Sequence, residues 1–247
     1  MKINRTVERA VKMLELLAKE KNGLTIKDIM DTMNIPKTSA YDILETLVHL
    51  EMLEKNPGEF NFYKIGLKSY QIGNTYSDRE IFKIIDKPLQ DLADKTEKTV
   101  FYAVENSGEI VYISKHESKK AIITTSGIGS TNPMYCTSLG KAILAFLPIE
   151  LSNNLINMQS FEKKTPFSLN KEELLKELEE IRVDGYAVDR GEVEKHMLCI
   201  GAPIFNFKNE LVGAISISGL SSKDRNIKSE AVELLKTSLE ISRKLGN

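Results

Sequence analysis

Cysteine is scarce in this chain of 247 residues, which contains only Cys136 and Cys199, far apart in the sequence. A disulfide framework or a zinc ribbon needs closely spaced cysteines, so neither is expected and both residues should be reduced thiols. No apolar run approaches the ~18 residues that a membrane span requires. Residues 1–14 also lack the apolar core and cleavage site of a signal peptide. We therefore expect a cytoplasmic protein without a membrane partner.

Neither sign of charge is in excess, because 34 Lys and Arg stand against 35 Asp and Glu, a formal net charge of −1. The whole molecule thus has no overall attraction for nucleic acid, and any DNA binding must come from a local surface. The chain also lacks a P-loop, a Rossmann fingerprint and a G-x-S-x-G elbow. No cofactor, metal or enzyme class is indicated by these motifs.

Residues 1–65 have the pattern of a winged helix-turn-helix domain. Apolar residues at three-and-four spacing over 6–20 predict an amphipathic helix. Thr25 followed by Asp28 predicts the cap of a second helix, and the break at 34–36 predicts a tight turn before a third. Two extended runs around 56–58 then predict a hairpin, the wing.

The third helix of this domain carries residues suited to contact DNA. Its first turns hold polar side chains that would reach base edges and phosphates, and the wing adds lysines as phosphate candidates. The candidates are Thr25, Lys37, Thr38, Ser39, Tyr41, Lys55 and Lys64. Taken singly, each lysine is also explained as a solvated surface residue. The whole segment could instead be a helical domain that binds a protein or dimerises.

The rest of the chain predicts an α+β domain with a largely antiparallel sheet. Residues 66–77 mix glycines and polar residues and mark a boundary, and a long amphipathic helix containing Pro88 follows. The pattern predicts these further elements: strands around the turn at 106–108 and at 121–126, 186–189, 197–205 and 211–219, and helices at 139–147, 172–182 and 227–245. We expect a DNA-binding domain over 1–65, a linker and connecting helix over 66–95, and a ligand-binding domain over 96–247.

Polar residues converge in the hairpin of the last two strands. If Phe205 pairs with Leu211, Cys199 lies opposite 216–218, where Ser216 and Ser218 share a face because side chains alternate with period two. Asp189, at the end of a short strand, adds a fourth polar group. In the alternative interpretation, these small residues only fill space between close-packed strands.

A second polar feature is the start of the helix near 138. Thr137 or Ser138 would cap it, and its first free N–H groups, near Ser138 and Leu139, would form a site for an anion such as a carboxylate. The alternative is an ordinary capped helix with Lys141 facing solvent.

An enzyme that uses Cys199 on small acids, with the N-terminal domain docking a protein, is the competing hypothesis. A Cys/His pair needs both side chains within hydrogen-bond reach. His196 is three residues from Cys199 in a strand pattern, so the two would point to opposite faces, while His116 and His49 stay open. Metal binding by Asp189, His196 and Cys199 lacks a standard ligand spacing.

Several blocks, taken together in order and spacing, resemble the IclR family of bacterial transcriptional regulators. The resemblance is carried by LTIKDIMDTMNIPKTSAYDILETL, YKIG, PMYCTSLGKAILA, GYAVDRGEVEKHMLCIGAPIF and LVGAISISG. It implies a winged helix-turn-helix, a linker helix and an effector domain similar to a GAF fold, assembled as a homodimer or a dimer of dimers on a double-stranded DNA operator. It also implies a switch that represses or activates a catabolic operon in answer to a small carboxylate, sugar acid or aromatic acid, and of the two roles we expect repression. The implied effector site is Ser138, Leu139, Asp189, Cys199, Ser216 and Ser218.

The chain departs from the family pattern in two places. Relatives often have arginine where this chain has Asp42, so a contact to a phosphate or a guanine is lost. The acid either repels DNA or accepts a hydrogen bond from the amino group of a cytosine. Relatives also often have glycine at or beside His196, which would reshape the mouth of the pocket.

Overall fold

The computed structural model describes residues 2–56, 61–78, 80–121 and 124–247. The chain forms two compact units, Met1–Arg79 and Glu80–Asn247. No helix within these described ranges is long and apolar enough to cross a membrane. Each unit has its own hydrophobic core.

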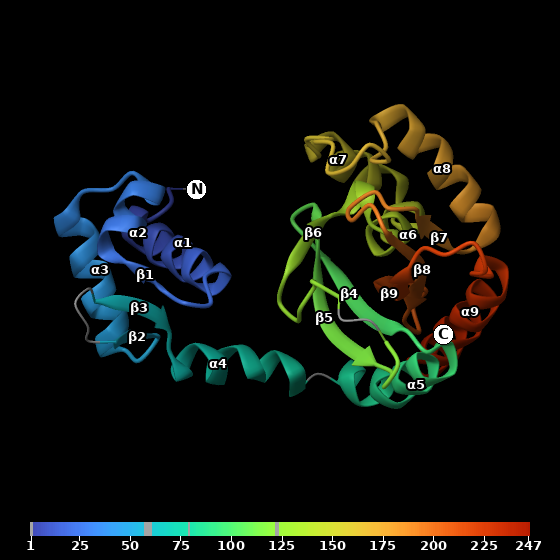
Figure 1. The fold of residues 1–247 in the computed structure, drawn as a ribbon, viewed down its shortest axis with the longest axis horizontal. Coiled ribbons are helices and arrows are strands. Elements are labelled where there is room, and N and C mark those ends of the chain that lie inside the picture. Colours follow the sequence, from blue (N-terminus) through green and yellow to red (C-terminus); the bar gives the residue numbers. More distant parts are fainter. Residues whose placement is uncertain (1, 57–60, 79, 122–123) are drawn as a thin grey trace. The chain divides into compact units, whose positions relative to one another are not determined.

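The first unit is the predicted winged helix-turn-helix (Figure 1). Its elements are α1 (Arg5–Lys19), β1 (Leu24–Thr25), α2 (Ile26–Met33), α3 (Lys37–His49), β2 (Leu53–Asn56), β3 (Phe62–Ile65), α4 (Leu67–Asn74) and a 3-10 turn (Thr75–Asp78). The predicted capping box of Thr25 and Asp28 begins α2, and Asn34 ends it with a left-handed φ of 50°. The three strands form an antiparallel sheet in the order β1-β3-β2. Residues 57 and 58 of the predicted wing turn lie outside the described residues.

The second unit is the predicted α+β domain with an antiparallel sheet flanked by helices. Its elements are α5 (Glu80–Thr96), β4 (Thr99–Asn106), β5 (Glu109–Glu117), β6 (Thr131–Pro133), a 3-10 turn (Met134–Cys136), α6 (Ser138–Phe146), α7 (Ile149–Met158), α8 (Lys171–Asp184), β7 (Ala187–Asp189), β8 (Met197–Phe205), β9 (Leu211–Leu220) and α9 (Ile227–Lys244). The strand order is β6-β5-β4-β9-β8-β7, and every neighbouring pair is antiparallel.

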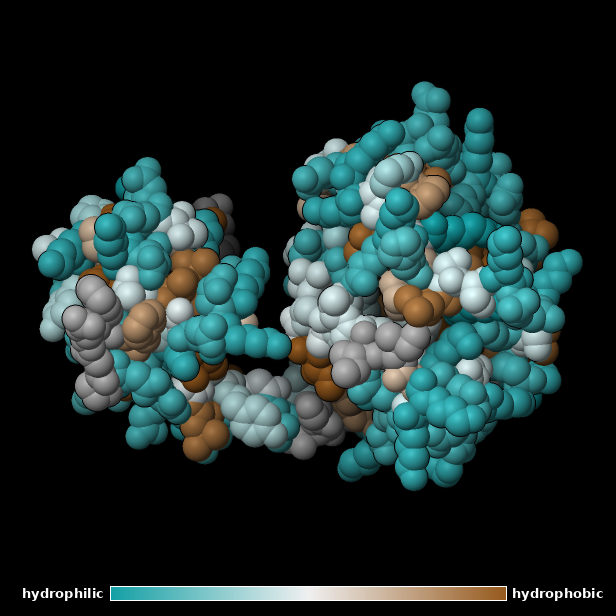
Figure 2. All heavy atoms as spheres, in the orientation of Figure 1, coloured by the Kyte–Doolittle hydropathy of each residue, from teal (hydrophilic) through white to brown (hydrophobic). Residues whose placement is uncertain are grey.

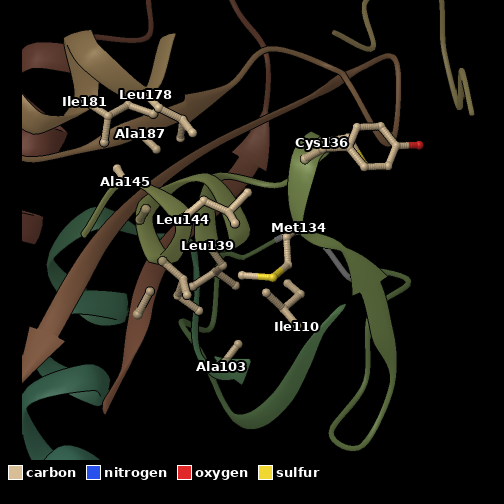
Figure 3. Close-up of a cluster of buried hydrophobic side chains, with 14 of the residues drawn as sticks. Ala103, Ile110, Met134, Cys136, Leu139, Leu144, Ala145, Leu178, Ile181 and Ala187 are labelled. Atoms are coloured by element: carbon tan, nitrogen blue, oxygen red, sulfur yellow. The ribbon is translucent and has the colours of Figure 1, made fainter. Parts of the chain in front are cut away.

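Two hydrophobic clusters cover the two faces of this sheet. On one face, α5 and α9 pack against alternate residues of the central strands, including Val100 and Ile217. On the other face lie α6 and α8, and Figure 3 shows Leu139 and Leu144 of α6 among the buried side chains of this cluster, with Ile181 of α8 nearby. Because successive side chains in a strand point to opposite faces, each face keeps its own set of residues.

Three local predictions differ from the structure. Part of the strand expected over 121–126 lies outside the described residues, the described part has no strand, and the strand that pairs with β5 is β6. Helix α7 was not predicted, and the expected boundary at 66–77 contains α4.

Candidate functional site

A pocket opens in the second unit between the sheet and the N-terminus of α6. All six residues expected to bind a ligand line it: Ser138, Leu139, Asp189, Cys199, Ser216 and Ser218. The space between the walls, counted out to the solvent at the mouth, is about 460 Å³. About 40 Å³ of this space is free for a water-sized molecule, so the site has room for only a small ligand.

The strand register explains why these side chains meet. The predicted pairing of Phe205 with Leu211 is confirmed, with a bulge beside it, and Cys199 lies directly opposite Ser218. On its other side, Cys199 pairs with Asp189 of β7. Directly paired residues share a face of the sheet, so these three side chains form one row across three strands.

The N-terminus of α6 lies directly on a second row of the sheet. Gly201, paired with Ser216, has no side chain there, and a Cβ at this position would be 2.4 Å from the carbonyl oxygen of Ser138. Thr137 caps the helix by accepting a hydrogen bond of 3.0 Å from the N–H of Gly140. The capped start of α6, with Ser138 and Leu139, therefore lines the pocket, and the N-terminus of a helix favours an anion.

The polar groups of the pocket differ in what they can do chemically. Ser216 is 1% exposed, and its Oγ has no hydrogen-bond partner in the described part of the chain. Burial raises the pKa of Asp189 to about 6, against the lowering effect of the hydrogen bond that it accepts from the N–H of Glu192 at 2.7 Å. Burial, together with the charge of Asp189, raises the pKa of Cys199 to about 12. The site therefore offers a neutral thiol, hydroxyl groups and the carboxyl groups of Asp189 and Glu194.

Aromatic residues that sequence reasoning missed form another wall. The rings of Phe101 and Tyr112 lie 4.9 Å apart between centroids, and Asn132 donates to the Tyr112 hydroxyl at 3.2 Å. Burial raises the pKa of Tyr112. Phe101 lies on this wall because it pairs with Ser216, in a strand far away in the sequence, and so shares its face of the sheet.

Lys141 of α6 was also missed, and the interpretation that it faces solvent is wrong. Its side chain is fully buried, and its ammonium group donates to Glu192 at 2.5 Å, to Glu177 at 2.9 Å and to the carbonyl of Val188 at 2.7 Å. Burial raises the pKa of Glu192 above its usual range, although Lys141 acts to lower it. The apolar residues around all sides of α6 were the available signal that this lysine would be buried.

The geometry gives the cysteine-enzyme hypothesis no support. His196 is exposed in the turn before β8, and His116 contacts Ser114 at 2.9 Å and Asp86 of α5 at 3.8 Å, on the sheet face opposite the pocket. His49 belongs to the other compact unit. A thiol with a raised pKa is a poor nucleophile at neutral pH. Within the described ranges, no three His, Cys, Asp or Glu side chains are grouped to hold a metal ion.

The first unit exposes the start of α3, as a DNA-reading helix requires. Lys37, Thr38, Tyr41 and Asp42 are exposed there. Ser39 is half-buried, and its Oγ accepts a hydrogen bond of 3.1 Å from Arg9 of α1, a contact that sequence reasoning missed.

The other DNA-binding candidates differ in how free they are to reach a phosphate. Thr25 donates its hydroxyl hydrogen to Asp28 at 2.6 Å, which commits it to the cap of α2. In the wing, Lys55 pairs with Glu45 at 2.6 Å, and Lys64 is half-buried on β3.

A winged helix-turn-helix with an exposed reading helix, joined to a domain with a buried polar pocket, defines a DNA-binding transcriptional regulator. Residues 73–245 match the description "Bacterial transcriptional regulator IclR C-terminal", and residues 6–57 match "IclR helix-turn-helix domain". The chain belongs to the IclR family.

Named relatives align with nearly the whole chain. It is 31% identical to the HTH-type transcriptional regulator XynR of Escherichia coli K12, over 100% of this chain and 99% of that protein. It is 29% identical to the HTH-type transcriptional repressor AllR of the same strain, over 97% and 90%. The crystal structure of Thermotoga maritima IclR superposes with a TM-score of 0.76 at 30% identity, covering 98% of this chain and 99% of that one.

Proposed function

We propose that this regulator represses a catabolic operon and that a small organic acid or sugar acid, bound in the pocket of the second unit, changes its affinity for the operator. The observation that carries the proposal is Ser216, a buried hydroxyl without a partner in the described part of the chain, in the pocket beside the N-terminus of α6. A buried polar atom of this kind costs free energy unless a ligand or water satisfies it. Repression is supported by the similarity to AllR, which is named a repressor.

The proposed site comprises Ser138, Leu139, Asp189, Cys199, Ser216 and Ser218. A carboxylate at the start of α6 would accept hydrogen bonds from the N–H groups of Ser138 and Leu139, with the serine hydroxyls completing its contacts. The ligand acts only through its different affinities for the DNA-competent and incompetent arrangements, a coupling of about 1–3 kcal/mol. Residues 66–95 would transmit this bias to the reading helix.

We further propose that the protein acts as a homodimer or a dimer of dimers on a two-fold operator. An exposed apolar stripe on α1 supports this: Ile3 just before the helix, Val7 and Val11 are 61%, 60% and 48% exposed. Figure 2 shows that hydrophobic residues also reach the mostly hydrophilic surface of this unit on the face drawn. Light scattering of the purified protein tests the assembly, and a monomer at micromolar concentration would contradict it.

The test of the regulator itself is operator binding with and without candidate acids. We expect at least one acid to weaken binding of the wild-type protein and a Ser216→Ala variant to respond less, with its DNA affinity in the absence of acid unchanged. Ser238→Ala is the matched control, since Ser238 is also buried but donates to the carbonyl of Pro203 and does not line the pocket. Failure of every acid to alter DNA binding would reject the proposal, and tighter binding with acid would reject repression relieved by the ligand.

A further inference from the structure

One lysine of the wing lies on the inner face of its strand. Along β2, buried Leu53 and half-buried Lys55 alternate with the exposed residues Glu54 and Asn56. Because side chains alternate between the two faces of a strand, Lys55 lies on the same side as Leu53, which belongs to the hydrophobic core of the unit. The register places Tyr63 of β3 directly opposite Lys55. Lys55 therefore lies on the side of the wing that packs against the helices.

The ammonium group of Lys55 is held by three side chains. It donates a hydrogen bond to Glu45 Oε1 of α3, with an N to O distance of 2.6 Å. It also lies 5.6 Å from the ring centre of Tyr63 and 6.0 Å from that of Tyr41, the distance range of cation–π contacts. The Lys55 side chain is 27% exposed. Its charge is thus held between the reading helix α3 and the wing.

Glu45 joins both strands of the wing to the reading helix. The oxygen that accepts from Lys55 also accepts a hydrogen bond of 3.0 Å from the hydroxyl group of Tyr63, which is 2% exposed. The hydrogen bond from Lys55 lowers the pKa of Glu45, so the group is a carboxylate at pH 7. Glu45 follows the exposed Tyr41 by one helical turn and shares its face of α3. The DNA-reading side of α3 therefore carries an acid whose counter-ion is Lys55.

The pair of Glu45 and Lys55 presents no net charge to DNA. A lysine strengthens DNA binding when its ammonium group replaces the counterions of a phosphate. To reach a phosphate, Lys55 must leave Glu45, and the carboxylate then lies near the negative DNA backbone without its cation. The contacts of Lys55 with the rings of Tyr41 and Tyr63 are lost as well. Each of these losses opposes a phosphate contact by Lys55.

We infer that Glu45 is a positioning residue that holds Lys55 against the reading helix and withholds this lysine from the DNA backbone. The cluster of Tyr41, Glu45, Lys55 and Tyr63 fixes the wing on α3 and adds no attraction that is independent of sequence. The phosphate contacts of the unit then come from cations outside the cluster, of which the exposed Lys37 is one candidate. Binding to DNA of any sequence is weakened, so operator binding depends more on contacts to bases.

The test is binding of the full-length protein to a labelled DNA duplex of mixed sequence, measured by fluorescence anisotropy from about 50 to 200 mM salt. In Glu45→Gln, the amide oxygen still accepts from Tyr63, but Lys55 loses its ion pair and becomes free to contact a phosphate. One additional phosphate contact steepens the slope of log K against log salt by about 0.9. The gain in affinity should therefore be roughly threefold larger at the lowest salt than at the highest. In a Lys55→Met background the same change frees no lysine, and the slope should remain that of Lys55→Met alone.

Asp31→Asn is the matched control, because it removes an exposed acid of α2 that forms no ion pair within the described part of the chain. It should leave the slope unchanged. An unchanged slope in Glu45→Gln would overturn the inference. So would an equal change of slope with and without Lys55, since it would show an effect of charge alone.

The single variant Lys55→Met tests the inference even if Glu45→Gln does not fold. Its slope should stay close to that of the wild-type protein. A slope that is shallower by about 0.9 would overturn the inference, because the wild-type lysine would then contact a phosphate. Every measurement is made without an acid, so the outcome is separate from that of the proposed function.

Discussion

The ammonium group of Lys141 lies 2.5 Å from Glu192 Oε1, and both side chains are buried, with 0% and 4% of their surfaces exposed. This pair ties α6 to the segment that follows β7. The start of α6 and residues of that segment, Val193 and Glu194, line the pocket. The stability of the second unit and the shape of the pocket therefore depend on the same ion pair.

Replacing Lys141 with Met should destabilise the protein by about 3–5 kcal/mol, because it leaves Glu192 buried without its cation. Lys87→Met is the control, since Lys87 pairs with Asp91 on an exposed face of α5 and its replacement should cost little stability. Urea unfolding measures the loss of stability in both single variants. The double variant Lys141→Met with Glu192→Gln should recover part of the loss, and equal costs for the two lysine variants would contradict this account.

A methyl group at Gly201 should disturb the start of α6. The Cβ of Gly201→Ala would lie 2.4 Å from a backbone oxygen, so the helix must shift, at a cost of about 1–3 kcal/mol and with a loss of acid binding. Gly127→Ala is the control, because nothing lies within 4 Å of its Cβ, and it should change stability by less than about 0.5 kcal/mol. Thermal unfolding and calorimetric binding measure the two effects, and a neutral Gly201→Ala would show that the helix does not depend on this contact.

The thiol of Cys199 should react slowly in the folded protein. A pKa of about 12 leaves a thiolate fraction at pH 7.5 that is roughly a thousandfold smaller than that of a free cysteine. Iodoacetamide labelling followed by peptide mass spectrometry should detect little modification until urea is added. Rapid labelling in the native state would restore the case for a nucleophilic cysteine.

Asp189 should make stability depend on pH. Its pKa rises from 3.8 to about 6 on folding, so between these values the folded state binds more protons than the unfolded state. The stabilisation of the folded state by the proton on Asp189 is thus complete below about pH 4 and is lost as the pH rises through 6. The free energy of unfolding of the wild-type protein should fall by about 3 kcal/mol over this range. The free energy of unfolding of Asp189→Asn, relative to wild type, should therefore increase from pH 4 to pH 7. A difference that is constant with pH would contradict the raised pKa.

The lysines of the first unit should differ in their effect on DNA binding. Lys37→Ala should weaken binding to duplex DNA and reduce the slope of log K against log salt by about 1 if Lys37 contacts a phosphate. Lys55→Ala should reduce the slope less, because Glu45 lies 2.6 Å from the Lys55 ammonium group. Fluorescence anisotropy over a salt series measures both slopes, and an unchanged slope for Lys37→Ala would argue against its phosphate contact.

Local signals were enough to predict most helices and strands, but not those that tertiary contacts decide. Helix α7 contains Ser152 and three asparagines, which are weak helix formers, and it is held by burial of residues such as Leu155 and Ile156. Strand β6 has three residues and ends at Pro133, and only its pairing with β5 makes it a strand. No pattern within either segment carries this information.

The sequence by itself predicted the helix-turn-helix and a hairpin that brings Cys199 near Ser216 and Ser218, because caps, helical periodicity and the two-residue repeat of strands act over a few residues. Only the tertiary structure decided that Lys141 is buried in an ion-pair network and that the pocket lining holds acids without a cation in the residues described. Those facts depend on contacts between Lys141 of α6, Glu177 of α8 and Glu192, which are up to 51 residues apart in the chain. Their energies arise from burial in the folded interior, which no local pattern encodes.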